Sequence, residues 1–451
     1  MSRYIPRQIE DTCLRRIKSG LITAILGARQ VGKTTLLIKL GEIAAARGIV
    51  SKERIFYYSL DDPMLRAEIK KDFRFLEKEL EKSLGEQISK IKKPILLIID
   101  EAQKSPDIFE WIKIIYDCHR KNIKILISGS SSLGIRKKSA ESLAGRITFL
   151  KLFPFTLREI ITESTGINLP PPLWREFPRK KIKNYFLSRQ ALLYRQKILL
   201  NKLLERILIE GTLPAVYTSK LCDEKQLRLS SIVSTYLEKD IRALGEVGSF
   251  DDYSNLLKTL SFEIGSMLNL NHLSSELGIA YNTVKKYVSI LKETFILNPL
   301  SPLFACARKK VVKSSKMYFF DVGIANFLSK RTAKEHIKDA AGGFLFENVL
   351  IKSYESENAN RSMPGDMRFW RDYEGHEIDL VINDGDGANI PVEICRNKIF
   401  PREKLRNYYS FFTSAPGGKK SPFGIFIYQG DVGMEKIDKR PVYLIPWWLW
   451  W

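Results

Sequence analysis

One short stretch of the sequence combines glycines, a lysine and a threonine in a spacing that suits phosphate binding. The β-rich residues 21–26 lead into Gly27-x-x-x-x-Gly32-Lys33-Thr34, and an amphipathic segment of helical period follows. Glycines let successive backbone N–H groups wrap phosphate oxygens, and the N-terminus of the following helix adds a positive dipole. Lys33 is therefore expected to reach the β- and γ-phosphates of a nucleotide and to assist catalysis there, and Thr34 to ligate Mg²⁺. The residues expected to bind the nucleotide are Gly27, Ala28, Arg29, Gln30, Val31, Gly32, Lys33, Thr34 and Thr35.

A second stretch places two acids at the end of an apolar run. Residues 95–99 are continuously apolar, as a buried parallel strand requires, and Asp100 and Glu101 follow directly. Asp100 can hold the shell of the magnesium ion, and Glu101 is placed to polarise an attacking water. Hydrolysis needs such a base, whereas a nucleotide switch needs only the metal ligand, so the pair favours an ATPase that uses ATP and Mg²⁺. The alternative is a solvated pair of acids at a strand end.

Two further groups could complete this site. The apolar run 123–127 leads to Ser128 and Ser130, and either hydroxyl could reach the γ-phosphate, so the choice between them stays open. Arg146 follows a glycine just before another apolar run and could serve the ATP of a neighbouring subunit as an arginine finger. This interpretation predicts a homo-oligomer, for which a ring is one form. The alternative is an ordinary arginine in a surface salt bridge.

The elements that carry these residues predict a parallel α/β sheet. Strand, glycine loop and helix come first, followed by the strand in "RIFYYSLDDP", the acid-tipped strand and the serine-tipped strand. In such sheets the site lies at the carboxyl ends of the strands. The motifs "YIPRQIEDTCL", "GARQVGKTTLL", "YYSLDDP", "IIDEAQ", "SGSSS" and "ESLAGRITFLKLFPFTLREI" resemble those of AAA+-like P-loop ATPases. More narrowly, they resemble a prokaryotic family that joins such an ATPase to a C-terminal half of unassigned function.

Composition sets the broad class of the protein. The 451 residues suggest about two to four domains. The net charge of +22 favours a polyanionic partner such as nucleic acid, although a generally basic surface would give the same excess. No apolar run reaches the roughly 18 residues of a membrane span, and the N-terminus is charged, so a cytoplasmic protein without membrane attachment is expected. The five cysteines are scattered, which argues against structural zinc or a disulfide framework.

Residues 267–297 have the pattern of a helix-turn-helix. The short helix expected at "HLSSEL" is followed by a turn at Gly278, and Asn282 or Thr283 is expected to cap a second helix. The next run, 299–321, predicts two strands around a basic turn, so that the whole would be a winged helix. Its residues expected to contact nucleic acid are Asn282, Thr283, Lys285, Lys286, Lys309, Lys310 and Lys313. The alternative is a winged helix that packs between domains or subunits.

Three acids in the last part of the chain suggest a metal site. Asp379 and Glu393 lie on two predicted strands, and Glu347 lies near the start of a predicted helix. The pattern resembles the PD-(D/E)xK nuclease fold, which the same ATPase family carries at this place. There the acids would hold Mg²⁺ and a lysine at position 395 would activate water. Position 395 is a cysteine, which is neither a cation nor a ligand for a hard metal. Lys398 could replace that lysine only if the strand ended near residue 396. We expect the fold without cleavage.

Together these patterns predict four domains. They are an ATPase core at 1–160, a helical lid with a basic insertion at 161–255, a winged helix at 256–330 and a degenerate nuclease-like α/β domain at 331–451. The leading hypothesis is a Mg²⁺-dependent ATPase that binds nucleic acid, with duplex DNA expected, and moves its domains on hydrolysis. The alternatives are an ATP/ADP-controlled signalling switch that recruits a protein partner, and an ATP-gated DNA nuclease. The tail "YLIPWWLWW", with four of the seven tryptophans, is expected to cover its own domain.

Overall fold

The computed structural model describes residues 4–130, 142–172, 182–235, 249–303, 315–338, 340–361, 363–383 and 388–451. The chain divides into two compact units, one made of Met1–Pro154 with Glu293–Phe295 and the other of Phe155–Lys292 with Ile296–Trp451. Within the described residues, no helix is long and apolar enough to cross a lipid bilayer.

The first unit is built on a five-stranded sheet with the order β2-β3-β4-β1-β5. Its strands are β1 (Ile22–Leu26), β2 (Ile55–Ser59), β3 (Ile95–Asp100), β4 (Ile123–Gly129) and β5 (Ile147–Lys151). Every neighbouring pair is parallel, so the carboxyl ends of all five strands meet at one edge. The predicted parallel α/β sheet is therefore confirmed. Because β4 lies between β1 and β3, the end of β4 reaches this edge between the loop after β1 and the acids after β3.

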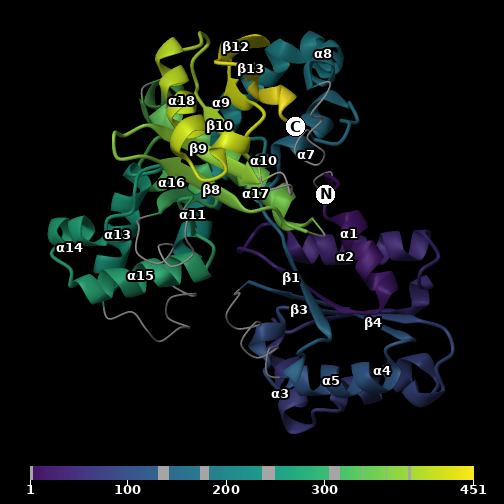
Figure 1. Cartoon of the computed structure of the whole chain (residues 1–451). Helices are drawn as coiled ribbons and strands as arrows, with labels where there is room; N and C mark the ends of the chain where they lie inside the picture. The colour runs from purple at the N-terminus through teal and green to yellow at the C-terminus, as the bar shows by residue number, and fades with distance from the viewer. Residues whose placement is uncertain are drawn as a thin grey trace. The chain divides into compact units, whose positions relative to one another are not determined.

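Helices cover both faces of this sheet, with α1 and α2 on one face and α4 and α5 on the other (Figure 1). They are α1 (Glu10–Ser19), α2 (Lys33–Ala46), α3 (Pro63–Lys71), α4 (Phe75–Leu84) and α5 (Ile108–His119). The buried side of α2 carries Leu36, Leu37 and Leu40, all with no exposed surface. The guanidinium of the buried Arg7 donates to the carbonyl oxygens of Val31 (3.0 Å) and Phe153 (2.6 Å). The N-terminal segment is thereby joined to the glycine loop and to the chain that follows β5.

The second unit begins with a group of helices. They are α7 (Leu157–Thr165), α8 (Ile182–Leu193), α9 (Lys197–Glu210), α10 (Pro214–Tyr217), α11 (Cys222–Thr235) and α16 (Val322–Leu328). The turn expected between helices is confirmed, because α9 ends at Glu210 and α10 begins at Pro214. The buried Asp321 connects the start of α16 to the turn after α9. Its carboxylate accepts from the backbone N–H groups of Thr212 (2.6 Å) and Gly323 (2.9 Å). The helical pattern of residues 232–247 is described only in part: residues 232–235 end α11, and residues 236–247 lie outside the described residues.

A compact helix-and-strand group follows. It contains α13 (Phe250–Phe262), α14 (Leu270–Leu277), α15 (Tyr281–Glu293) and the antiparallel pair β6 (Leu297–Leu300) and β7 (Lys316–Phe319). Gly278, at φ 66°, makes the expected turn, and the apolar face predicted for the second helix is buried. One expectation is wrong: Asn282 and Thr283 do not cap α15. The backbone N–H groups of Thr283 and Val284 both donate to the carbonyl of Ala280, so the helix begins earlier and these residues lie in its first turn.

The predicted basic turn between β6 and β7 falls on residues that lie outside the described part of the chain. Lys309, Lys310 and Lys313 lie outside the described residues. The two strands that flank them are present as expected.

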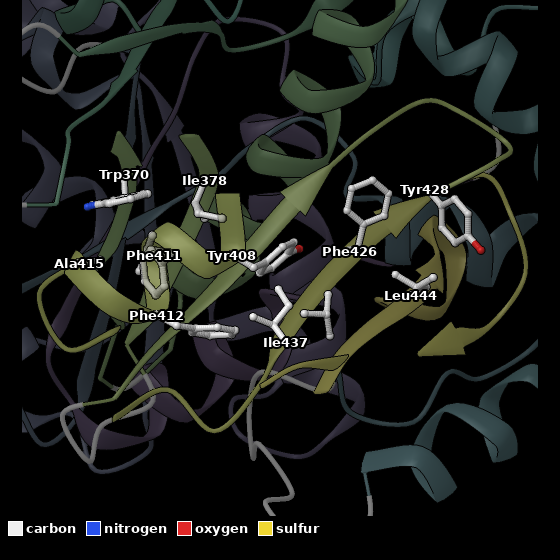
Figure 2. Packing of buried hydrophobic residues seen from close by; sticks show 12 residues of the cluster. Trp370, Ile378, Tyr408, Phe411, Phe412, Ala415, Phe426, Tyr428, Ile437 and Leu444 are labelled. Atoms are coloured by element: carbon white, nitrogen blue, oxygen red, sulfur yellow. The ribbon is translucent and has the colours of Figure 1, made fainter. Parts of the chain in front are cut away.

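The last part of the chain forms a six-stranded sheet with the order β12-β13-β11-β10-β9-β8. Its elements are α17 (Ala340–Ala359), β8 (Met367–Arg371), β9 (Glu377–Asn383), β10 (Asn389–Ile394), α18 (Leu405–Ser414), β11 (Gly424–Tyr428), β12 (Gly433–Ile437) and β13 (Arg440–Pro446). Strands β8, β9 and β10 form an antiparallel meander, and β11 pairs in parallel with β10. Figure 2 shows the aromatic side chains of α18 in one cluster with residues of the sheet: Phe411 lies beside Trp370, with 5.4 Å between the ring centroids, and Phe412 lies next to Phe411. Glu347 lies in the third turn of α17 rather than near its start, because the helix already begins at Ala340.

The tryptophan-rich end of the chain is part of this core. All four tail tryptophans are at most 2% exposed. The ring of Trp450 lies 6.4 Å from that of Tyr354, and Arg158 donates to the carbonyl of Trp451 (2.7 Å). The tail is buried as expected, but it contacts Arg158, outside the predicted domain 331–451, as well as Tyr354 within it.

Candidate nucleotide-binding site

The glycine loop after β1 has a shape that its sequence imposes. A Cβ atom at Gly27 would lie 2.4 Å from the carbonyl oxygen of Leu152, so no larger residue fits there without a shift of the backbone. Gly32, at φ 89°, adopts the left-handed conformation just before α2 begins at Lys33. Ala28 and Val31 are buried beneath the loop, while Thr35 is exposed on the first turn of the helix. The loop therefore turns its backbone around the N-terminus of α2.

Lys33 lies inside the curve of this loop. Its side chain is only 4% exposed, and its Nζ donates to the carbonyl oxygens of Gly27 (3.1 Å) and Ala28 (3.0 Å). The same ammonium lies 3.7 Å from a carboxylate oxygen of Glu101. A cation is thus held between the loop and the end of β3.

Thr34 and Asp100 meet at the base of the loop. The Thr34 hydroxyl donates to Oδ2 of Asp100 at 2.6 Å, and the Tyr57 hydroxyl donates to the same oxygen at 2.9 Å. Ser128 donates to the other oxygen, Oδ1. Burial raises the pKa of Tyr57, and the charge of Asp100 raises it further, so the phenol stays a hydrogen-bond donor. A hydroxyl and a carboxylate are hard oxygen ligands, which fits a magnesium ion at this position.

Glu101 is held in a strained backbone conformation. Its φ of 56° and ψ of 44° place it in the left-handed region, which is uncommon for a residue with a side chain. Its backbone N–H donates to Ser128 Oγ (3.1 Å), while Gln103 (2.5 Å) and Ser130 (3.2 Å) donate to its carboxylate. The carboxylate is therefore turned toward Lys33 and the glycine loop.

The structure brings together most of the residues predicted for this site. Lys33, Thr34, Asp100, Glu101 and both serines lie around the carboxyl ends of β1, β3 and β4. The two serines have different partners, because Ser128 bonds Asp100 and only Ser130 bonds the Glu101 carboxylate.

Sequence reasoning missed Tyr57 and Gln103. A signal for Tyr57 existed, since it lies on the strand that pairs with β3, with Ile98 as its partner. No spacing rule pointed to Gln103.

Within its own chain, Arg146 does not contact the residues of the nucleotide site. Its guanidinium forms a paired contact with Asp117, with Nε–Oδ1 at 2.6 Å and Nη2–Oδ2 at 2.9 Å. The hydrogen bonds from Arg146 lower the pKa of Asp117. Both side chains are substantially exposed, so this is a surface ion pair within one subunit.

The acids expected to form a second metal site are divided between two cations. Glu347 and Asp379 both contact the ammonium of Lys316, whereas the fully buried Glu393 accepts from Lys404 (3.0 Å) and Asn407 (2.7 Å). Burial raises the pKa of Glu393 to about 8, and the nearby charge of Asp379 adds to this.

The lysine that contacts Glu393 is Lys404 and not Lys398, the residue that the sequence left open as a substitute for a lysine at position 395. Strand β10 ends at Ile394, yet Lys398 is exposed, and Lys404 from the turn before α18 reaches Glu393 instead. Cys395 lies against the hydrophobic cluster of Figure 2. Sequence reasoning missed Lys404, because its approach depends on how the chain turns after β10.

The residues predicted to contact nucleic acid from α15 lie on its outer surface. Asn282, Lys285 and Lys286 are exposed, and Thr283 is half-buried. Their side is opposite to the buried apolar face of the helix, which leaves them accessible within the second unit.

Comparisons with known proteins cover the chain in three segments. Residues 19–161 match the model of an AAA domain. Residues 201–335 and 342–450 match two different domains of unknown function. Uncharacterized proteins of Mycobacterium tuberculosis and Mycobacterium bovis are each 23% identical over 371 residues, which is 82% of this chain and 69% of theirs. One from Haemophilus influenzae is 22% identical over 314 residues, 68% of each chain.

Solved structures give weaker likenesses. The ORC1 protein of Aeropyrum pernix, solved in complex with DNA, is 15% identical with a TM-score of 0.28, covering 73% of this chain and 94% of that one. AMPPCP-bound DnaA of Aquifex aeolicus is 17% identical with a TM-score of 0.26, covering 72% and 92%. These scores are too low to carry an argument about function. The domain match and the parallel sheet agree: residues 19–161 are similar to an AAA domain, and the first unit has the parallel α/β sheet of the P-loop NTPase fold.

Proposed function

We propose that this chain is a Mg²⁺-dependent ATP hydrolase. One observation carries the proposal: the 2.6 Å bond between Thr34 and Asp100 lies beside the 3.7 Å approach of Lys33 to Glu101. A metal ligand pair, a phosphate-binding cation and a base therefore meet at the edge of one sheet. This is the set that phosphoryl transfer to water requires.

The roles of these residues follow from their positions. The Lys33 ammonium would move from the loop carbonyls to the β- and γ-phosphates, and Thr34 and Asp100 would hold the magnesium ion. Glu101 accepts a proton as the water oxygen bonds to the γ-phosphorus and the bond to the ADP oxygen breaks. Gln103 and Ser130 orient the Glu101 carboxylate, and Ser130 is the serine that faces the γ-phosphate. Tyr57 is a positioning residue for Asp100.

The partner in this proposal is nucleic acid, with duplex DNA as the form. The support is that α13, α14 and α15 are followed by the antiparallel β6–β7 pair, the element order that a winged helix has, and that Lys285 and Lys286 are exposed on α15. The net charge of +22 agrees with this partner. ATP hydrolysis would then move the domains of this cytoplasmic protein relative to one another.

DNA should accelerate ATP hydrolysis in a salt-dependent way. The test measures phosphate release with and without duplex DNA at two salt concentrations, and DNA affinity by fluorescence anisotropy. The double variant Lys285→Glu with Lys286→Glu should weaken binding by about tenfold or more at low salt, since two phosphate contacts become repulsive.

The matched control for charge is Lys71→Glu with Lys78→Glu, which changes two exposed lysines of the first unit. This pair should leave DNA affinity nearly unchanged. Absence of both DNA stimulation and salt-sensitive binding in the wild type would remove the DNA partner and favour the signalling switch. Tightly bound ADP in the purified protein would strengthen that alternative.

Arg146 is proposed to act on the ATP of a neighbouring subunit in a homo-oligomer. The Arg146→Ala variant should lose kcat by about 10³-fold, as expected for an arginine finger. Mixed with a Glu101→Gln variant, it should regain activity, because mixed interfaces pair an intact Glu101 with an intact Arg146. The control Asp117→Ala removes only the surface ion pair and should keep turnover. Unchanged kcat in Arg146→Ala would leave the residue as half of that ion pair.

We propose that residues 342–451 have a PD-(D/E)xK nuclease-like fold that does not cut DNA. The support is the order α17, β8–β9–β10 meander, α18, β11 with a parallel β10–β11 pair. The cysteine at position 395 argues against cleavage. In a plasmid-nicking assay with Mg²⁺ or Mn²⁺, wild type and Asp379→Ala should give the same result, with no nicking that depends on Asp379.

A further inference from the structure

A buried lysine ammonium lies among three carboxylates in the second unit. Lys316, on β7, is 4% exposed, and its Nζ lies 2.8 Å from Glu347, 2.5 Å from Glu377 and 3.0 Å from Asp379. Glu347 comes from α17, and the other two acids come from β9. Three elements that are far apart in the sequence therefore meet at one cationic nitrogen.

The groups around this nitrogen are of the type that a hard divalent cation prefers, although with the ammonium between them their oxygens do not all lie within 4.8 Å of one another. Carboxylate oxygens from several directions are the ligands that Mg²⁺ and Mn²⁺ prefer. Two of the acids, Glu347 and Asp379, are those that the sequence assigned to a metal site. Their oxygens point instead at Lys316, so the ammonium occupies the centre that they share.

The charges explain why this lysine stays ionised although it is buried. Burial alone lowers the pKa of Lys316, but the charges of Glu347 and Asp379 outweigh it and leave the pKa above its ordinary value. Burial raises the pKa of Glu347 to about 7, and Asp379 adds to this. The Tyr318 hydroxyl also donates to Glu347. A buried cation without these partners would be strongly destabilising.

The fourth acid of the region has a cation of its own. Glu393 is paired with Lys404, and Lys404 also lines the pocket of about 490 Å³ that opens beside Lys316, Glu347 and Asp379. The pocket therefore offers lysines as well as acids, and a divalent ion entering it would meet an ammonium at the centre of its ligands. Repulsion between the two cations opposes such entry.

We propose that Lys316 is the resident cation of this acid site: its ammonium takes the place of a divalent metal ion, keeps metal out, and fastens strand β7 to the C-terminal sheet. The site is then an internal ionic latch between the helix-and-strand group and the nuclease-like sheet. The proposal also accounts for the absence of a lysine at position 395. A site that binds no metal does not need a base that activates metal-bound water.

The test removes the lysine and asks whether a metal ion replaces it. Lys316→Met keeps the length of the side chain and removes its charge, which leaves Glu347, Glu377 and Asp379 facing one another. Mn²⁺ binding is measured by electron paramagnetic resonance on the full chain without nucleotide. Wild type should bind no Mn²⁺ that depends on Asp379. The variant should bind one additional Mn²⁺ per chain, at least about tenfold more tightly than any wild-type site, and Asp379→Asn in the same background should abolish it.

Stability gives a second measurement on the same proteins. The Lys316→Met variant should melt well below wild type without metal, and millimolar Mn²⁺ should recover several degrees, as binding to the folded state predicts. The control Lys352→Met removes another buried lysine of the same region, one whose ammonium pairs with Glu355. It should gain no Mn²⁺ and no recovery. The group of half-buried Asp372 and His376 with exposed Glu374 could bind Mn²⁺ weakly in all variants, as could Glu263 with His272 and Glu276, and both contributions cancel in the comparison.

Two outcomes would overturn the proposal. One is an Mn²⁺ site in wild type that is lost in Asp379→Asn, which would show that Lys316 does not exclude metal. The other is a folded Lys316→Met chain, verified by circular dichroism, that binds no more Mn²⁺ than wild type. If Lys316→Met does not fold, the wild-type titration decides alone. None of these measurements depends on ATP hydrolysis, so the ionic latch and the ATPase activity are tested independently.

Discussion

Replacing Glu101 by glutamine is expected to stop ATP turnover while ATP still binds. Glutamine keeps the length of the side chain and can still accept the hydrogen bonds of Gln103 and Ser130 through its amide oxygen. It cannot accept a proton from water, so kcat should fall by about 10²–10⁴-fold. The affinity for Mg²⁺-ATP should stay within a few-fold of wild type, because the glycine loop, Lys33 and Asp100 are unchanged. Phosphate release gives kcat, and isothermal titration calorimetry gives the affinity.

The matched control for this substitution is Glu42→Gln. Glu42 is an exposed acid on α2 that pairs with Lys39, at a distance from the ends of the strands. Its loss should leave both kcat and affinity unchanged. A Glu101→Gln chain that turns over ATP at the wild-type rate would show that another group is the base.

Replacing Lys33 by alanine is expected to remove ATP binding itself. The lysine supplies the one ammonium that the structure places inside the glycine loop, among the described residues. Charge-assisted bonds to phosphate oxygens are strong, and losing them should weaken ATP binding by about 100-fold or more, or about 2.8 kcal/mol. The affinity is measured by competition with a fluorescent ATP analogue.

Lys39→Ala is the control for this change. Lys39 lies on the same helix, is half-buried and pairs with Glu42, so its removal should not affect ATP affinity. The melting temperature without nucleotide separates loss of binding from loss of folding in both variants. ATP affinity that survives the Lys33→Ala change in a folded chain would mean that the nucleotide is held elsewhere.

The nucleotide site could be predicted from sequence because its parts are local. Gly27 to Thr34 are contiguous, and a parallel sheet necessarily brings the ends of its strands to one edge. The apolar run before Asp100 therefore placed the acids beside the loop without any knowledge of packing. The contributions of Tyr57 and Gln103 depend on side-chain directions at that edge, and spacing does not encode those.

The contacts in the acid site of the second unit could not be predicted from local sequence patterns. Lys316 belongs to residues 294–320, a segment without acids, so the sequence pointed to no partner for its charge. Its ammonium is instead buried by acids that follow it by at least 31 residues in the chain. Such a contact depends on how the β6–β7 pair packs against β9 and α17, and hydrophobic periodicity carries no information about that packing.

Element types were predicted better than element ends. The structure starts α15 at Tyr281, two or three residues earlier than a cap at Asn282 or Thr283 would, and it ends β10 at Ile394. The earlier start places Asn282 and Thr283 inside the helix but leaves them on its outer surface. Backbone hydrogen bonds decide these ends, and side-chain preferences only bias them.

Electron paramagnetic resonance of Mn²⁺ with a non-hydrolysable ATP analogue tests the central claim most directly. That claim is one metal–nucleotide site built from the glycine loop, Thr34 and Asp100. The account predicts one Mn²⁺ per chain that binds only when the analogue is present, and that is weakened in both Thr34→Ala and Asp100→Asn. Nucleotide-dependent Mn²⁺ that is indifferent to both substitutions, or no such Mn²⁺ at all, would contradict it.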